Sequence, residues 1–156
     1  MDNFNPEPLS IRPFRPEDRN DVRALWKSAG LVRPWNNPDA DINRKLRVDP
    51  ELFLVAVWKE DLVGTVMGGY DGHRGWVNYL ATDPEYRNRG IARKLVQHLE
   101  TELLKRGCPK INLQIREENQ EVRAFYEKLG YSVDAAISMG KRMIEDSLSQ
   151  DIEPKS

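Results

Sequence analysis

The most distinctive polar stretch of the sequence is the turn "RNRGIA", residues 87–92, which separates an apolar run from a long amphipathic segment. Gly90 and the small Ala92 let the backbone approach a ligand closely, because neither carries a bulky side chain. At a helix start the first backbone N–H groups have no partner within the helix and carry the positive end of its dipole. Such a turn can bind a phosphate group. The alternative is a basic, solvated helix start that binds nothing.

Basic side chains strengthen the field around this turn, namely those of Arg87, Arg89, Arg93 and Lys94. The whole chain has 24 basic and 25 acidic residues and a net charge of −1, so no global field recruits nucleic acid or a membrane. Any anion site must therefore be local. Neither a Walker loop nor the G-x-G-x-x-G fingerprint after a first strand occurs, which argues against P-loop and dinucleotide-binding Rossmann sites.

A second polar constellation lies in "ENQEVRAFYEKLGY", residues 118–131. Tyr126 carries a hydroxyl that can donate a proton, and Asn119 can form hydrogen bonds with a ligand. Each residue also has a structural interpretation. Asn119 is a good helix cap, and Tyr126 lies on the apolar stripe of its helix, where it can serve as a core residue with a satisfied hydroxyl.

The elements that must position these groups follow from the hydrophobic periodicity. Strands are predicted over residues 9–14, 52–58, 62–70, 76–82 and 110–116, with one or two short strands in 131–139; helices begin at Pro16, Asn37, Gly90 and Asn119. Three strands joined by tight turns imply an antiparallel meander, and the following strand–helix–strand unit requires a parallel pair. The predicted fold class is α+β, a mixed, mostly antiparallel sheet with helices on both faces, in the order β-α-α-β-β-β-α-β-α-β(-β).

The length of 156 residues fits one domain, predicted over residues 9–146, with flexible tails at 1–8 and 147–156. The single cysteine, Cys108, excludes an internal disulfide and has no adjacent base, so we interpret it as structural. No signal peptide and no apolar run near the ~20 residues of a membrane span is visible. We expect a cytoplasmic monomer or homodimer without a metal, a membrane anchor or a nucleic-acid partner.

Several motifs resemble those of the GNAT superfamily of N-acetyltransferases. The turn matches that family's pyrophosphate-loop pattern [QR]-x-x-G-x-[GA] as R87-N-R-G-I-A92, within "YLATDPEYRNRGIARKL" (79–95), which resembles its fourth strand, loop and third helix. Residues 118–131 resemble its fourth helix. The stretches "RPWNNPD" and "GTVMGGYDGHRG" are similar to the YpeA-type bacterial members. The resemblance spans roughly residues 9–140 and agrees with the element order above.

The resemblance implies acetyl-CoA as the cofactor, with its pyrophosphate on the backbone N–H groups of residues 89–92. In that family the fourth and fifth strands splay apart, and pantetheine lies along the fourth strand. A backbone N–H of Leu80 or Ala81 would then stabilise the oxyanion of the thioester carbonyl, and Tyr126 would protonate the departing thiolate as general acid. The cofactor-binding residues that the resemblance implies are Leu80, Ala81, Thr82, Arg87, Asn88, Arg89, Gly90, Ile91, Ala92, Asn119 and Tyr126.

A general base is missing from the positions where relatives carry one. Gln114 stands where some relatives have Glu, the predicted strand 76–82 contains no acid, and Glu117 and Glu118 fall at the exit of the next strand. We therefore expect proton loss through water or capture of an already neutral amine. An α-amine has a pKa near ~8, against ~10.4 for lysine, so an α-amine or a similarly weak base is the easier acceptor.

The acceptor pocket is expected, by resemblance, in the loop of residues 31–36. Arg33 can bind a carboxylate through two hydrogen bonds, and Trp35 can form a wall, although Trp35 can instead pin the loop. The sequence thus predicts an acetyl-CoA-dependent N-acetyltransferase acting on a primary amine, either a small molecule or a peptide or protein α-amine. The alternatives are transfer of another acyl group, a non-catalytic acetyl-CoA-binding sensor or partner module, and a scaffold that binds nothing.

Overall fold

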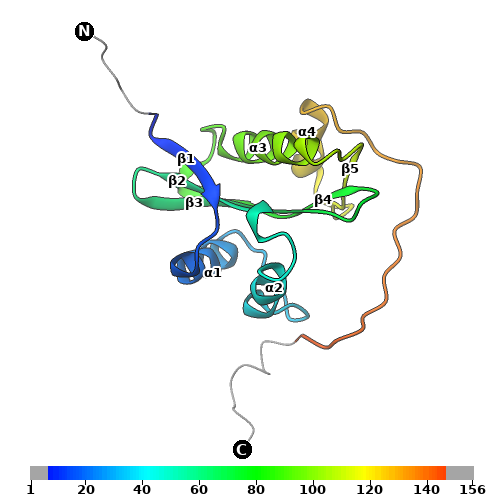
Figure 1. Cartoon of the computed structure of the whole chain (residues 1–156), viewed down its shortest axis with the longest axis horizontal. Helices are drawn as coiled ribbons and strands as arrows, with labels where there is room; N and C mark the ends of the chain where they lie inside the picture. Colours follow the sequence, from blue (N-terminus) through cyan, green and yellow to red (C-terminus); the bar gives the residue numbers. More distant parts are fainter. Residues whose placement is uncertain (1–6, 147–156) are drawn as a thin grey trace, which may run out of the picture.

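The computed structural model describes residues 7–146, in which one sheet separates two pairs of helices (Figure 1). The strands are β1 (Leu9–Pro13), β2 (Phe53–Trp58), β3 (Asp61–Tyr70), β4 (Gly75–Thr82) and β5 (Ile111–Leu113). The helices are α1 (Arg19–Ser28), α2 (Pro38–Lys45), α3 (Ile91–Lys105) and α4 (Gln120–Lys128). The predicted tails at 1–8 and 147–156 lie outside the described residues, apart from Glu7 and Pro8.

The sheet has the strand order β1-β2-β3-β4-β5. The first four strands pair antiparallel and β4 pairs with β5 in parallel, which confirms the predicted meander and crossover. The parallel ladder is short, because it runs only from Gly75 opposite Ile111 to Val77 opposite Leu113. Residues 78–82 of β4 therefore have no strand neighbour on the β5 side, and the sheet opens there.

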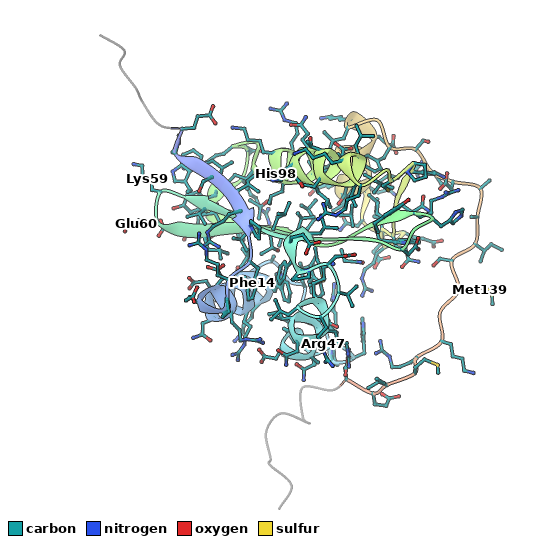
Figure 2. The ribbon with its side chains drawn as sticks, in the orientation of Figure 1. Phe14, Arg47, Lys59, Glu60, His98 and Met139 are labelled. Atoms are coloured by element: carbon teal, nitrogen blue, oxygen red, sulfur yellow. The ribbon has the colours of Figure 1, made fainter. Side chains whose placement is uncertain are left out.

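The two faces of the sheet carry separate cores. Helices α1 and α2 cover one face, and α3 and α4 lie on the other (Figure 1). On the α3 face, Leu95, Leu99 and Leu103 are fully buried against β2, β3 and β4. On the α1 face, Phe14, which Figure 2 shows beside α1, stacks on Phe53 with ring centroids 4.7 Å apart. No helix among the described residues combines the length and the apolar character that a bilayer span requires.

Helix starts follow the capping chemistry of the sequence. Asn37 caps α2, because its side-chain oxygen accepts a hydrogen bond of 3.1 Å from the Ala40 N–H and Pro38 supplies the first helical residue. Residues Pro16–Asp18, predicted as the start of a helix, form a separate 3₁₀ turn before α1. Asp18 in this turn is buried and pairs with Arg12 of β1 at 2.7 Å. The first helix is thereby fixed to the edge strand.

The strands predicted within residues 131–139 are absent. Among the described residues no strand follows α4, and residues 132–146 run as an extended segment along one side of the molecule (Figure 1). The reason is that β5 is only three residues long and offers a short ladder edge. Side-chain contacts hold the segment instead, between Lys110 and Asp134 at 2.8 Å and between Gln114 and Ser138. Its apolar side chains stay exposed, as Ile137 and Met139 show at 91% each.

Candidate active site

A groove of about 1160 Å³ opens where β4 and β5 separate. Its walls are the end of β4, the loop between α1 and α2, the groove side of α2, the exit of β5 and the start of α4. The structure brings most of the predicted side chains into this one lining, namely Arg33, Trp35, Leu80, Thr82, Ala92, Asn119 and Tyr126. Residues separated by up to 93 positions in the sequence thus face a common space.

Other predicted residues do not line the groove with their side chains. Ala81 is buried in the core under α1, and Ile91 is buried in the core under α3. Arg87 and Asn88 are exposed on the turn outside the groove. Arg89 directs its guanidinium over the rings of Trp58 and Tyr86, 4.9 Å from each centroid. These residues can therefore act through their backbone more readily than through their side chains.

The turn before α3 has the geometry of an anion-binding site. Asn88 and Gly90 are left-handed, with φ of 64° and 74°, and no side chain caps the helix. The first helical hydrogen bond runs from the Lys94 N–H to the Gly90 carbonyl at 3.1 Å. The N–H groups of residues 91–93 consequently have no partner within the helix, and they sit at the positive end of its dipole.

A β-bulge distorts β4 at the groove. Thr65 pairs with Ala81, but Met67 pairs with Asn78, so Tyr79 and Leu80 together stand opposite one residue of β3. Tyr79 takes a left-handed φ of 50°, which turns its ring toward α1, where it stacks on Trp26 at 3.9 Å. The extra residue of a bulge lacks a ladder partner. No glycine or proline marks this bulge in the sequence, so it was not predicted.

Tyr126 is a buried residue that also belongs to the lining of the groove. Its side chain is buried, with 5% exposure, and packs edge to face against Tyr131 at 5.4 Å. It also lines the groove, and its hydroxyl makes no hydrogen bond within residues 7–146. Burial raises the pKa of Tyr126, so the hydroxyl keeps its proton at neutral pH. The group is therefore a core residue whose hydroxyl remains available to a ligand.

The remaining predicted polar groups make hydrogen bonds within the protein, line the groove, or do both. Asn119 caps α4, because its Oδ1 accepts a hydrogen bond of 3.2 Å from the Val122 N–H, while the residue also lines the groove. Gln114 lines the groove and donates to the Ser138 hydroxyl. Thr82 Oγ1 is the single buried side-chain polar atom without a hydrogen-bond partner in the described part of the chain. Thr82 shares the groove lining with Ala92 of α3, and an unsatisfied hydroxyl in that lining fits a site that takes a polar ligand such as coenzyme A.

The groove side of α2 was missed by the sequence analysis. Asp41, Arg44 and Lys45 recur at helical spacing on α2 and line the groove, together with Val48 shortly after the helix ends. Asp41 accepts a hydrogen bond from the Tyr79 hydroxyl, which in turn accepts one of 2.9 Å from the Asn36 amide. The signal was present in the sequence, because this stripe lies beside the buried Ile42, but charged residues next to a core stripe normally face solvent.

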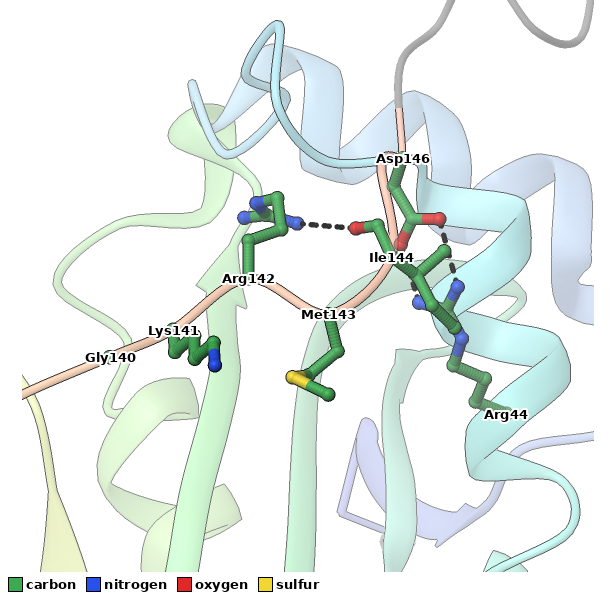
Figure 3. Close-up of a pocket in the computed structure, with 7 residues that line it drawn as sticks. All are labelled: Arg44, Gly140, Lys141, Arg142, Met143, Ile144 and Asp146. Atoms are coloured by element: carbon green, nitrogen blue, oxygen red, sulfur yellow. Dashed lines mark hydrogen bonds and ion pairs between the residues drawn. The ribbon is translucent and has the colours of Figure 1, made fainter.

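The extended segment after α4 closes one end of the groove. Asp146 forms a bidentate pair with Arg44, whose guanidinium nitrogens lie 2.5 and 2.8 Å from its two oxygens (Figure 3). Arg142 lines the groove and donates to the Ile144 carbonyl at 3.4 Å. A smaller hollow of about 500 Å³ lies between Arg44 and residues 140–146 (Figure 3). The other rim is formed by Trp35, 48% exposed, under the guanidinium of Arg116 at 5.3 Å.

Comparison with known proteins agrees with this architecture. A model of the acetyltransferase (GNAT) family matches residues 19–131. An acetyltransferase of Pectobacterium atrosepticum is 53% identical over 138 residues, covering 88% of this chain and 98% of the relative. One of Sodalis glossinidius is 52% identical over 139 residues with the same coverages.

Solved structures show the same fold at low sequence identity. Ard1 from Thermoplasma volcanium superposes with a TM-score of 0.71 at 23% identity, over 82% of this chain and 85% of its own. The aminoglycoside N-acetyltransferase AAC(6')-Iy, solved in complex with CoA, gives 0.71 at 17% identity, over 87% and 95%. The ribosomal-protein-S18-alanine N-acetyltransferase from Escherichia coli gives 0.67 at 22% identity, over 78% and 76%. By family match and by close relatives, the chain belongs to the GNAT acetyltransferase family and is an acyltransferase.

Proposed function

We propose that this protein is an acetyl-CoA-dependent N-acetyltransferase that moves an acetyl group directly to a primary amine through a tetrahedral intermediate. The observation that carries the proposal is the opening of the sheet beside β4, with the uncapped start of α3 at one end and Tyr126 in its wall. A pantetheine arm fits such an opening as an additional extended chain, because the backbone of residues 78–82 has no strand neighbour there.

The pyrophosphate of the cofactor is assigned to the N–H groups of residues 91–93 together with the turn before them. Gly90 leaves the adjacent space open, since a Cβ built there would meet only the Arg93 side chain, at 3.7 Å. The hydroxyl of Thr82 would gain the hydrogen bond that it lacks in the free protein. Asn119 keeps its side-chain N–H₂ for the pantetheine, because the cap uses only its oxygen.

Acetyl-CoA supplies the activated acetyl thioester, and the chain supplies an oxyanion donor and an acid. Leu80 is the stronger candidate for the oxyanion donor, because it belongs to the bulge, whereas Ala81 pairs with Thr65. One preorganised donor of this kind is often worth ~3 kcal/mol of transition-state stabilisation. The Tyr126 hydroxyl holds a proton for the leaving sulfur, and its raised pKa keeps that proton in place before reaction.

The amine approaches from the α2 side of β4, where Arg33 and Trp35 form the outer wall. Two structural neighbours act on different amines by their names, an aminoglycoside and an alanine of a ribosomal protein, so the fold alone does not select the acceptor. Gln114 lines the groove at the position where some relatives have Glu, and its amide cannot take a proton from the amine. This favours an acceptor that loses its proton readily.

The test is acetyl-CoA binding followed by an amine screen. Isothermal titration should give a coenzyme A dissociation constant in the micromolar range, and thiol release from acetyl-CoA should require an added primary amine. Failure of millimolar acetyl-CoA to raise the melting temperature would remove the proposal. Binding without thiol release across the panel would support the sensor function instead, and faster release from propionyl- or succinyl-CoA would indicate a different acyl donor.

A further inference from the structure

Lys45 is a buried lysine in the wall of the groove. It lies on α2, is only 9% exposed, and lines the groove beside Gly69 of β3. Within the described residues its ammonium makes no hydrogen bond and no ion pair. Burial lowers the pKa of Lys45, and the acids Asp49 and Glu51 raise it only through longer-range charge. The protein thus keeps a cation at this surface without a direct counter-charge.

Such an arrangement costs stability unless something compensates it. A charge removed from water is normally paired or bound to a ligand, because desolvation penalises the ionised form. Lys45 faces the groove, so a ligand in the groove can reach it. An anionic group there would restore the interaction that the lysine loses on burial.

A carboxylate stands one helical turn before this lysine on the same side of α2. Asp41 is half-buried, and its Oδ2 accepts a hydrogen bond from the Tyr79 hydroxyl, so its orientation is fixed. Its Oδ1 lies 3.6 Å from the Arg44 guanidinium, but both terminal nitrogens of Arg44 bind Asp146. The Oδ1 oxygen therefore remains able to accept a hydrogen bond from a cationic ligand.

The Asp41 carboxylate and the Lys45 ammonium have opposite charge and lie four residues apart on α2, which places their Cβ atoms roughly 6 Å from each other. We propose that the acceptor carries an anionic group as well as its amine, with the anionic group bound by Lys45 and the ammonium held by Asp41. The inference rests on the proposed function and narrows its substrate class to amino-acid-like amines. Arg33, for which the sequence also suggested carboxylate binding, is exposed, so its charge stays hydrated and loses less solvation free energy without a partner.

The experiment compares amines that differ only in the anionic group. α-, β- and γ-amino acids are assayed with their amides for kcat/KM, using wild type, Lys45→Met and Asp41→Asn. Wild type should prefer the best acid over its amide, and Lys45→Met should reduce that preference at least tenfold. Asp41→Asn should lower kcat/KM for acid and amide alike, since both carry the ammonium. The amino acid and its amide differ in basicity, but this difference cancels when the acid-to-amide ratio of kcat/KM is compared between wild type and each variant.

Control variants distinguish the loss of the Lys45 charge from a general loss of structure. Lys27→Met removes an exposed lysine of α1 and should leave the preference and the coenzyme A affinity unchanged. Lys45→Met should melt at a higher temperature than wild type, because methionine fills the same space without a buried charge, and Lys45→Gln serves if it does not fold. Phosphoethanolamine and ethanolamine form a further pair, which distinguishes a phosphate from a carboxylate as the anionic group.

The outcomes separate this inference from the proposed function. An unchanged acid-to-amide preference in Lys45→Met, or a wild type that favours amides, overturns the inference while acetyl transfer stands. If no amine is acetylated although acetyl-CoA binds, the proposed function loses its support, and calorimetry decides the inference. Amino acids should then bind the coenzyme A complex of wild type and not that of Lys45→Met; absence of binding to wild type overturns it.

Discussion

The hydroxyl of Tyr79 on β4 donates a hydrogen bond to the carboxylate of Asp41 on α2, and this contact joins the sheet to the helix in the wall of the groove. It depends on the bulge, because in a regular strand Tyr79 would face the same core as Val77, under α3, whereas Tyr79 packs against the core under α1. Burial, followed by the bond to Asp41, raises the pKa of Tyr79, so this hydroxyl stays a donor and does not become a base.

Replacing Tyr79 with phenylalanine should release Asp41 without emptying the core, since the ring stack on Trp26 remains. We expect the KM for the acceptor to rise several-fold with coenzyme A affinity unchanged. The free energy of unfolding should fall by about 1 kcal/mol, the usual net value of a lost hydrogen bond. Steady-state kinetics and urea denaturation check both values, and a loss of coenzyme A binding would show that the bulge itself had changed.

Gly90→Val should weaken coenzyme A binding at least tenfold. A β-branched side chain at a φ of 74° is strained and occupies the space beside the open N–H groups. Gly107→Val is the matched control, because Gly107 also has a positive φ, 81°, and open space around it, but lies at the far end of α3. Both variants should lose stability, and only Gly90→Val should lose affinity; equal affinities would remove the loop from the cofactor site.

Tyr126→Phe should lower kcat about tenfold and leave the dissociation constant of coenzyme A nearly unchanged. The effect is modest, because a thiol of pKa near ~8.5 leaves fairly well as a thiolate. Tyr131→Phe is the control, since the Tyr131 hydroxyl is bound to Glu100 at 2.9 Å and lies outside the groove lining. Unchanged kcat in Tyr126→Phe would assign the residue to the core alone.

The pH dependence of kcat tests whether the Tyr126 hydroxyl keeps its proton. Because burial raises the pKa of Tyr126 above its usual value of 10.0, the proton donor persists throughout the physiological range. The kcat of wild type should therefore rise with pH as the acceptor amine loses its proton, without a descending limb below pH 10. A decline with a lower apparent pKa that disappears in Tyr126→Phe would contradict this assignment.

Thr82→Val exchanges the unpartnered hydroxyl for a methyl group of the same shape. An unsatisfied buried polar group costs roughly 1–3 kcal/mol, so the free protein should become more stable by up to about that amount. Coenzyme A should bind several-fold more weakly, because the ligand loses a hydrogen-bond partner. Thermal melts with and without coenzyme A measure both effects, and a more stable variant with full affinity would exclude Thr82 from the cofactor site.

Asp18→Asn should destabilise the fold in a pH-dependent way. Burial raises the pKa of Asp18, but hydrogen bonds from Arg12 and the Arg15 N–H outweigh it, so the folded-state pKa lies below the usual 3.8. The stabilisation is present above the unfolded-state pKa and is lost as pH falls through the folded-state value. The variant should lose about 2 kcal/mol at pH 7, a difference that shrinks toward pH 2. Asp21→Asn, an exposed change on α1, should show no such trend.

Local signals in the sequence determined most of the fold. Apolar runs bounded by turn residues, some of them alternating and one nearly continuous, predicted all five strands. Proline, asparagine and glycine punctuation placed the helix starts at Asn37 and Asn119, because capping chemistry acts within three residues. The RNRGIA turn could be predicted for the same reason, because the six consecutive residues 87–92 are enough to indicate a helix start without a side-chain cap. The predicted strands at 131–139 were wrong, because pairing depends on the length of β5, which no pattern within that segment encodes.

Tertiary structure alone decided which side chains of α2 and of the β4 bulge line the groove. The bulge that turns Tyr79 toward Asp41 arises from the register between β3 and β4, a relation between residues 11 to 16 positions apart. Whether a lysine on a short helix faces solvent or a groove depends on where that helix docks, and Lys45 places its ammonium over Gly69 of β3. The sequence could therefore indicate the acyl-transfer chemistry of the family, whereas the packing of α2 against the sheet determines which charged side chains face the groove.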